Sequence, residues 1–283
     1  MRLRSLLFVP GDRPDRFAKA AAAGADTLIL DLEDSVAVDR KAFAREAIVS
    51  CLIGSWDGPP RFVRINPLEG DLCDADIAAL ANTRPDAIVL PKAEGAASVH
   101  MLVTRLAAVG LGGVPILPIA TETPRAIFAL GSFAEVGPSL AGLTWGAEDL
   151  PAAIGAATSR EADGRYTAPY ELARSLTLFA AHAADVAAIE TVFPAFRDLE
   201  GLTAYAARAA RDGYTGMMAI HPAQVSVINR AFSPSEAALT HARRVIAAFE
   251  ASPGVGAIQL DGVMIDAPHL KQARHLVGLA DPG

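Results

Sequence analysis

The sequence predicts an α/β protein of the (β/α)₈ class, the TIM barrel. Eight short apolar runs alternate with eight Ala-rich helical stretches over about 230 residues, close to the size of such a barrel. The apolar runs are nearly continuous, which is typical of parallel strands buried on both faces. An open doubly wound sheet has the same alternation, but it usually carries a glycine-rich phosphate turn after its first strand. Here that turn is Pro10-Gly11-Asp12-Arg13, so the barrel is favoured.

The order of elements follows from the apolar runs and from the prolines and glycines between them. The expected strands are residues 3–9, 27–32, 61–66, 87–91, 115–120, 140–145, 187–191 and 216–220. The expected helices are residues 13–23, 39–51, 74–81, 96–109, 124–130, 169–184, 199–211 and 222–229. Pro124, Pro169 and Pro222 suit first-turn positions, and Gly24 suits the end of the first helix.

The last fifty residues follow a different pattern. We expect residues 1–230 to form the catalytic barrel and residues 231–283 to form a C-terminal extension. The extension has a helix ending at Glu250, a hairpin around Asp261-Gly262 and a helix over residues 268–279. It is too short to bury a core of its own. We therefore expect a helical extension that packs on the barrel or on a neighbouring subunit and is not an independent domain.

Composition excludes several classes of protein. The chain has a net charge of −7 and 20% charged residues, so it lacks the basic surface of a nucleic-acid-binding protein. No apolar run approaches the roughly 20 residues of a membrane span, and the N-terminus does not resemble a signal peptide. Two cysteines cannot form a disulfide framework. We expect a cytoplasmic protein without a nucleic-acid or membrane partner.

Charged or titratable side chains follow nearly every expected strand. In chain order they are Asp31, Glu33, Asp34, Arg64, Lys92, Glu122, Glu148, Asp149, Glu190 and His221. Barrel enzymes place catalysis at the carboxyl ends of their strands. We therefore expect these side chains to meet at one rim, where carboxylates outnumber cations.

Converging carboxylates repel one another unless a cation neutralises them. Oxygen ligands favour Mg²⁺, with Mn²⁺ as an alternative. Glu122 and Asp149 follow adjacent strands, so one ion can bridge them. The competing interpretation is that both are helix N-caps or first-turn acids, and Asp149 fits this because a helix-like Leu150-Pro151 follows it.

The basic and neutral groups of the rim also have two interpretations each. Lys92 either forms a Schiff base with a carbonyl substrate or, as we favour, balances the acids around it. Arg64 is expected to point inward, where a guanidinium suits a substrate carboxylate. Asp31 and Glu33 share a direction while the chain stays extended. His221 is either a general base or, more simply, part of a packed His-Pro turn.

Eight short motifs, taken in order, resemble one family. They are Phe8-Val-Pro-Gly-Asp-Arg-Pro-Asp-Arg-Phe17, Leu30-Asp-Leu-Glu-Asp34, Val63-Arg-Ile-Asn-Pro67, Val89-Leu-Pro-Lys92, Glu122-Thr-Pro124, Gly146-Ala-Glu-Asp-Leu150, Ala219-Ile-His-Pro222 and Asp261-Gly-Val-Met-Ile-Asp266. Together they resemble the citrate lyase β-subunit-like (CitE-like) proteins of the HpcH/HpaI aldolase/citrate lyase family. The resemblance runs from Arg4 to about Leu276, almost the whole chain.

The resemblance implies a Mg²⁺-dependent carbon–carbon lyase on a TIM barrel. By the family pattern, Glu122 and Asp149 bind the metal, and Arg64 binds the oxygens of the substrate acid. Asp31, Glu33 and Asp34 hold water molecules around the metal. Asp266 is offered across a subunit interface as an acid or base, because relatives form homotrimers, or hexamers made from trimers.

The implied reaction cleaves a short 3-hydroxyacyl thioester, such as malyl-CoA, citramalyl-CoA or a citryl thioester. The products are a 2-oxo acid and an acetyl thioester, and the reverse is a condensation. Arg64, Lys92, Arg13 and Lys19 are the expected substrate-binding residues. Arg13, Arg16 and Lys19 are candidates for carrier phosphates, although they equally suit a solvated helix face. No motif identifies a docking surface for an acyl-carrier partner.

Two other functions remain open from the sequence. One is a metal-independent Schiff-base aldolase that uses Lys92. The other is a non-catalytic or complex-bound subunit of the citrate lyase β type. Two departures from the family pattern leave the substrate undetermined: Glu190 stands where many relatives have Asp, and residues 156–165 are idiosyncratic.

Overall fold

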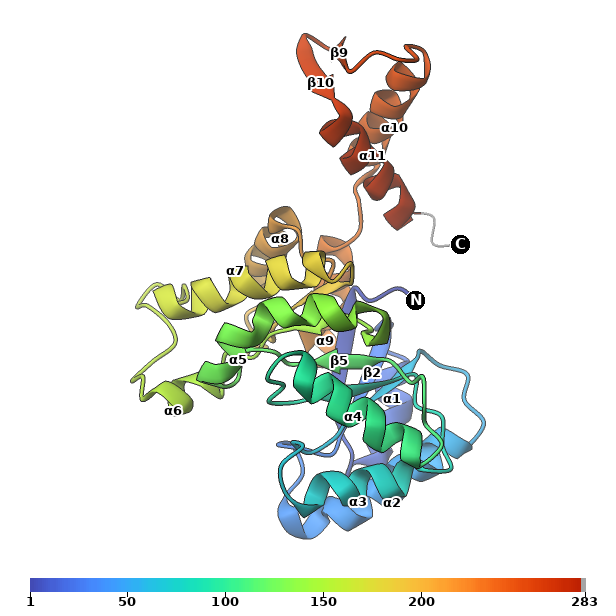
Figure 1. Ribbon diagram of the computed structural model, residues 1–283, viewed down its shortest axis with the longest axis vertical. Helices are drawn as coiled ribbons and strands as arrows, with labels where there is room; N and C mark the ends of the chain where they lie inside the picture. The colour runs from blue at the N-terminus through green and yellow to red at the C-terminus, as the bar shows by residue number, and fades with distance from the viewer. Residues whose placement is uncertain (281–283) are drawn as a thin grey trace. The chain divides into compact units, whose positions relative to one another are not determined.

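Eight parallel strands form a nearly closed barrel in the computed structural model, which describes residues 1–280 (Figure 1). The strands are β1 (Ser5–Pro10), β2 (Thr27–Asp31), β3 (Arg61–Arg64), β4 (Ala87–Leu90), β5 (Ile116–Pro118), β6 (Leu143–Thr144), β7 (Ala188–Glu190) and β8 (Gly216–Ala219). Their order is β5-β4-β3-β2-β1-β8-β7-β6. Single parallel bridges, Ile116 to Leu140 and Ile119 to Thr144, join the two outer strands. This confirms the TIM-barrel prediction, since β1 pairs with both β2 and β8.

Helices lie between the strands on the outside of the barrel (Figure 1). They are α1 (Phe17–Ala21), α2 (Lys41–Ile53), α3 (Asp71–Leu80), α4 (Ala96–Ala108), α5 (Pro124–Ala129), α6 (Leu150–Ile154), α7 (Ala168–Ala183), α8 (Leu199–Asp212) and α9 (Pro222–Ala231), with 3₁₀ turns η1 (Pro14–Arg16), η2 (Val38–Arg40) and η3 (Leu130–Ser139). Pro124 and Pro169 lie in first turns, as expected, and begin or nearly begin their helices. Buried apolar side chains from α4 and α7 cover the sheet.

Several sequence-based boundaries are wrong. Most strands are shorter than expected, and the extreme case is β6, where the expected residues 140–145 reduce to two paired residues and an isolated bridge. The 3₁₀ helix η3 is absent from the prediction, and α6 is expected only as a helix-like Leu150-Pro151 after Asp149. The sequence gives little signal for η3, because it contains two glycines and Pro138 and depends on tertiary packing for its conformation.

The interior of the barrel is filled by alternate residues of the strands. Its cluster of buried side chains contains Leu3, Leu6, Ile29, Phe62, Ala87, Val89, Leu117, Ile119, Ile189 and Met218. Side chains two residues apart on a strand share a direction. Asp31 therefore follows Ile29 into the interior, and Arg64 follows Phe62. The register pairs Asp31 directly with Arg64 on the neighbouring strand. Strand register alone thus brings an acid and a base together at the carboxyl end.

The chain divides into two compact units. One is Leu3–Asn229, and the other joins Met1–Arg2 to the chain from Arg230 onward. In the second unit α10 (Glu236–Glu250), the antiparallel pair β9 (Ala257–Leu260) and β10 (Val263–Asp266), and α11 (Ala267–Ala280) surround a small apolar cluster. Its packing on the barrel or on a neighbouring subunit stays a prediction.

No helix among residues 1–280 is long and apolar enough to cross a membrane.

A glycine in β8 provides a test of the barrel. A Cβ atom built on Gly216 would lie 1.8 Å from the carbonyl oxygen of Leu3. Because the neighbouring backbone of Leu3 and Arg4 cannot yield cheaply, we expect Gly216→Ala to lower the free energy of unfolding by about 1–3 kcal/mol or more. Gly131→Ala is the matched control, since a Cβ there meets nothing within 4 Å; its effect should stay within about 0.5 kcal/mol. Urea unfolding followed by circular dichroism measures both, and equal effects would contradict the close strand contact.

Candidate functional site

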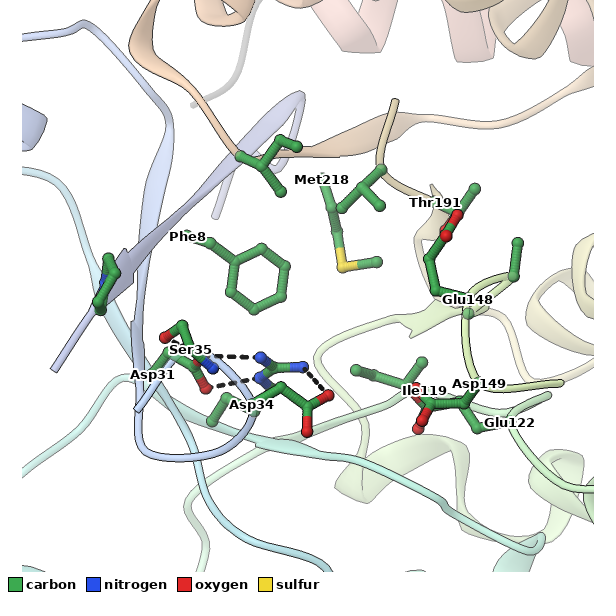
Figure 2. A pocket seen from close by; sticks show the side chains of 16 residues that line it. Phe8, Asp31, Asp34, Ser35, Ile119, Glu122, Glu148, Asp149, Thr191 and Met218 are labelled. Atoms are coloured by element: carbon green, nitrogen blue, oxygen red, sulfur yellow. Dashed lines mark hydrogen bonds and ion pairs between the residues drawn. The ribbon is translucent and has the colours of Figure 1, made fainter. Parts of the chain in front are cut away.

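A cavity of about 280 Å³ opens at the carboxyl ends of the strands (Figure 2). Its lining residues belong to or follow all the strands of the barrel except β4: Phe8, Pro10, Asp31, Asp34, Ser35, Arg64, Ile119, Glu122, Gly146, Ala147, Glu148, Asp149, Thr191, Val192, Met218 and Ile220. Figure 2 shows Glu122 and Asp149 on one side of the cavity and Asp31 and Asp34 on another. Polar groups therefore converge over an apolar floor that includes Phe8 and Met218, an arrangement typical of a small-molecule site.

Arg64 is the most strongly held cation in this cavity. Its Nε and Nη2 atoms donate to the two oxygens of Asp31 at 2.6 and 2.7 Å. Its Nη1 atom lies 2.7 Å from an oxygen of Glu33, and the guanidinium lies over the ring of Phe8. A guanidinium has five N–H donors. With three of these hydrogens directed at Asp31 and Glu33, two Nη hydrogens remain, and Nη1 also lies 4.0 Å from Asp34 at the cavity.

The turn after β2 is held by groups that the sequence analysis did not identify. The amide N–H groups of Glu33 and Ser35 donate to the carboxylate of Asp31. The Nζ atom of Lys41, on α2, donates to the carbonyl oxygens of Leu32 and Glu33 at 2.7 and 2.9 Å. Lys41 is buried as the first residue of α2, and its bonds to backbone carbonyls of the preceding turn leave no signal in the sequence. This turn brings Asp31 and Glu33 together on Arg64.

Glu122 and Asp149 both contact Lys92. The carboxylate of Glu122 accepts from the backbone N–H of Lys92 at 2.6 Å, and an oxygen of Asp149 lies 3.5 Å from Lys92 Nζ. The ammonium also donates to Glu33 at 3.0 Å. Lys92 has a left-handed φ of 51°, a conformation that costs energy in a side-chain-bearing residue. The sequence-based expectation that Lys92 balances the acids around it agrees with these contacts.

The charges of the site shift one another's pKa values. Burial raises the pKa of Glu122 to about 8, and the charges of Asp149 and Glu33 act in the same direction. Burial also opposes ionisation of Asp31, but its bonds to Arg64 outweigh this, so the pKa of Asp31 lies below its usual value. Burial opposes the charge of Lys92, but Glu33 and the other carboxylates outweigh it and raise its pKa. Lys92 is therefore an ammonium, whereas Schiff-base formation needs the neutral amine.

The geometry disfavours the capping interpretation of the two acids. Asp149 occupies the N-cap position of α6, but its side chain makes no capping hydrogen bond. Thr123, rather than Glu122, caps α5 through a bond from the N–H of Ala126. Both carboxylates thus face the cavity. No group of three or more His, Cys, Asp or Glu residues within 1–280 could hold a metal ion by itself. Two carboxylates nonetheless fit Mg²⁺, which keeps several water molecules or substrate oxygens as ligands.

A buried ion pair between Glu190 and Arg174 supports the carboxyl ends of β6 and β7. One oxygen of Glu190 accepts from the indole N–H of Trp145 and the backbone N–H of Thr191, and the other accepts from Arg174 at 2.6 Å. Glu190, Trp145 and Arg174 are buried. Because Trp145 immediately precedes the Gly146–Asp149 segment, Glu190 joins the end of β6 to the end of β7. Here Glu190 is part of the supporting framework and does not line the cavity.

Other predicted site residues lie outside the lining of this cavity. Arg13 pairs with Asp15 on the surface, and Lys19 is exposed on α1. His221 stacks on Phe196, and its Nδ1 atom accepts from the N–H of Ala223, as a packed turn would. Asp266 ends β10 in the other compact unit. The substrate and catalytic roles of Arg13, Lys19 and Asp266 stay predictions.

Comparison with known proteins identifies the family. The family model HpcH/HpaI aldolase/citrate lyase matches residues 4–222. The chain belongs to this family. It is 40% identical to the citrate lyase subunit beta-like protein of Mycobacterium tuberculosis over 273 residues, which are 96% of this chain and 93% of that protein.

Two relatives from Cereibacter sphaeroides and one crystal structure extend the comparison. The chain is 33% identical to an L-malyl-CoA/beta-methylmalyl-CoA lyase and 35% identical to a (3S)-malyl-CoA thioesterase; each match covers 98% of this chain and 94% of the relative. The crystal structure of the M. tuberculosis protein CitE with magnesium, acetoacetate and coenzyme A superposes with a TM-score of 0.84. Its sequence is 38% identical, and the match covers 99% of this chain and 98% of that one. Family membership and fold agree with the resemblance in the sequence.

The Glu190–Arg174 pair gives a test of how the rim is supported. Glu190→Ala leaves a buried guanidinium without one of its partners, so we expect the free energy of unfolding to fall by about 3–5 kcal/mol. Glu135→Ala is the matched control, since Glu135 is exposed, and its effect should stay within about 0.5 kcal/mol. Chemical unfolding followed by tryptophan fluorescence measures both. A Glu190→Ala protein as stable as the control would show that the pair does not support the barrel.

Proposed function

We propose that this chain is a Mg²⁺-dependent carbon–carbon lyase of the CitE-like type. The substrate would be a short 3-hydroxyacyl thioester of coenzyme A, and the products a 2-oxo acid and an acetyl thioester. The observation that carries the proposal is the convergence of Glu122, Asp149 and Arg64 on one cavity. The site therefore offers two carboxylates for a metal and a guanidinium for a substrate carboxylate.

The relatives support both the reaction class and the cofactor. One similar protein is a malyl-CoA/methylmalyl-CoA lyase, and the similar crystal structure holds magnesium, acetoacetate and coenzyme A. A buried, raised-pKa carboxyl such as Glu122 becomes a carboxylate readily when a divalent cation is bound next to it. Glu122 and Asp149 would hold the Mg²⁺, with Mn²⁺ as an alternative. When bound, the metal supplies a Lewis acid next to the oxygens of the oxo-acid half.

Each remaining residue has a role that follows from its contacts. Asp31 and Glu33 fix Arg64, and the two remaining Nη hydrogens of Arg64 would bind the carboxylate of the substrate. A bidentate or forked contact of this kind fixes orientation as well as charge. Lys92, held at 3.0 Å from Glu33, would place a second positive charge beside the oxo-acid half. Glu33 and Asp34 would order water around the metal.

The reaction needs one proton removed and one proton delivered. When the substrate's hydroxyl proton passes to a water molecule, the O–H electrons form the carbonyl of the oxo acid. The carbon–carbon bond then breaks, and its electron pair moves onto the thioester half as an enolate. The charges of the site stabilise that enolate. Asp266 of a neighbouring subunit would then protonate the enolate carbon. This role follows the family pattern and requires a homotrimer, or a hexamer built from trimers, which we also propose.

Three further aspects extend the proposal. Arg13, Arg16 and Lys19 would contact phosphates of coenzyme A outside the cavity. The C-terminal extension, residues 231–283, would complete a neighbour's site rather than act as an independent domain. The free cysteines Cys51 and Cys73 support a reducing, cytoplasmic location.

Hydrolysis of the thioester is a second candidate activity. It is supported by the 35% identity to a (3S)-malyl-CoA thioesterase. Product analysis separates the two, since a lyase yields glyoxylate and acetyl-CoA from malyl-CoA, whereas a thioesterase yields malate and free coenzyme A. The Schiff-base alternative is disfavoured because Lys92 is ion-paired with Glu33. A complex-bound subunit would be inactive alone and would co-purify with a carrier protein.

The first experiment assays purified protein with malyl-CoA and citramalyl-CoA. We expect cleavage to a 2-oxo acid and an acyl-CoA that stops with EDTA and returns with Mg²⁺. Borohydride added with a 2-oxo acid should leave the mass of the intact protein, measured by mass spectrometry, unchanged. Activity that survives complete chelation, or covalent trapping on Lys92, would contradict the proposal.

The metal ligands are tested by binding rather than by activity. We expect Glu122→Gln and Asp149→Asn each to weaken Mg²⁺ binding about 100-fold, because each removes one of two charged ligands. Glu148→Gln is the matched control, since Glu148 also lines the cavity and precedes Asp149. Titration calorimetry with Mg²⁺, or electron paramagnetic resonance with Mn²⁺, measures the affinities. If Glu148→Gln abolished binding and Asp149→Asn did not, the ligand assignment would be wrong.

A further inference from the structure

A histidine in the C-terminal unit contacts the proposed acid, Asp266. Asp266 is the last residue of β10, and His269 lies in the first turn of α11. The Nδ1 atom of His269 is 2.6 Å from Oδ1 of Asp266 and 3.2 Å from the backbone nitrogen of Asp266. A ring nitrogen carries either a proton or a lone pair. It therefore cannot donate to the carboxylate and accept from the backbone N–H at once.

The shorter contact favours Nδ1 as a donor. Two bare acceptors would repel at 2.6 Å, whereas a hydrogen bond to a carboxylate is short. We therefore assign the proton to Nδ1, which donates it to Oδ1. The competing arrangement is a capping box, in which His269 accepts from the N–H of Asp266. It is the weaker of the two, since its contact is 0.6 Å longer, the difference between 3.2 and 2.6 Å.

The surroundings of the pair leave the imidazole accessible. The side chains of His269 and Asp266 are 50% and 41% exposed. His269 also lines a cavity of about 210 Å³ between α10 and α11, together with His241 and Gln272. Arg244 of α10 is paired with Asp261. Within residues 1–280, His269 is the one basic side chain in an ion pair with Asp266.

We propose that His269 is a positioning residue for Asp266, the residue that exchanges a proton with the substrate carbon. This inference rests on the proposed lyase function. The Nδ1–Oδ1 bond fixes the rotamer of Asp266 and leaves its second oxygen, Oδ2, free to face a substrate. The exposed ring also gives the pair a route to solvent.

The proton balance in the cleavage direction needs water as the only further reactant. In the loaded pair, Nδ1 of His269 donates its proton to Oδ1 of Asp266, and Oδ2 of Asp266 carries a second proton. Asp266 delivers the Oδ2 proton to the enolate carbon: the O–H bond breaks, its electrons stay on the carboxylate, and the enolate electron pair forms the new C–H bond. The pair then takes one proton from solvent, and the hydroxyl proton lost by the substrate passes to solvent, so no net proton is consumed. Condensation runs the same steps in reverse.

The first test examines the pair without substrate. In the ¹⁵N-labelled full-length protein, the ring nitrogen shifts of His269 report which nitrogen is protonated, and the His269→Asn spectrum assigns the signals. We expect Nδ1 to carry the proton in the neutral ring of the wild type. Asp266→Asn should move the neutral ring toward the Nε2–H form. The same tautomer in both proteins would overturn the pairing.

The second test examines the role of the pair in proton transfer. With Mg²⁺ and a 2-oxo acid present, deuterium exchange into the methyl group of acetyl-CoA in D₂O reports proton transfer at carbon. We expect His269→Ala to slow exchange and lyase kcat by about 10- to 100-fold, a part of what acid–base catalysis contributes. KM for the thioester and the Kd of Mg²⁺ should stay unchanged, because His269 touches neither.

Two variants distinguish a positioning role of His269 from a nonspecific effect of substitution on the structure of α11. His269→Asn keeps an N–H donor at the Nδ1 position, so it should recover part of the exchange rate lost in His269→Ala. His275→Ala is the matched control, since His275 is exposed on the same helix, and it should behave as wild type. An active wild type with unaffected His269→Ala would overturn this inference alone. A wild type that neither cleaves the thioester nor exchanges deuterium would overturn the lyase proposal. The tautomer measurement would still test the hydrogen bond between His269 and Asp266.

Discussion

The bidentate bond between Arg64 and Asp31 is the interaction on which the site depends. Both side chains point into the barrel, and the β2–β3 register makes them direct neighbours. Asp31 is fully buried, so its charge is tolerated only because Arg64 and the amides of the following turn satisfy it. Once this pair is formed, Glu33 is drawn to the same guanidinium, and the free edge of Arg64 is fixed toward the cavity.

The second half of the rim is organised by an excess of negative charge. Glu122, Asp149 and Glu33 all contact Lys92, and the pKa of Glu122 is raised to about 8 by burial and by its acidic neighbours. One ammonium group neutralises only part of this charge. A divalent cation between Glu122 and Asp149 would relieve the remaining repulsion, which is the physical reason why the metal proposal fits the residues present. The same argument explains why Lys92 acts as a counter-ion.

The family relationship and the geometry address different questions. The family match and the similar crystal structure establish what kind of protein this is. The cavity shows what its residues can do: a forked guanidinium, a pair of carboxylates and an apolar floor that includes Phe8 and Met218.

The sequence by itself determined the fold class and the chemical types of the rim. Continuous apolar runs, first-turn prolines and acids after strands are local signals, so the barrel and the residues Arg64, Lys92, Glu122 and Asp149 were all predictable. Local signals did not give the strand ends or the buried roles of Lys41 and Glu190. The strand ends and Glu190 depend on partners distant in the chain, whereas Lys41 bonds backbone carbonyls eight and nine residues before it, which no sequence pattern marks. The tertiary structure alone decided the pairing of donors and acceptors in the site. A hydrogen bond requires exact atomic positions, and strand register and helix packing fix these positions together.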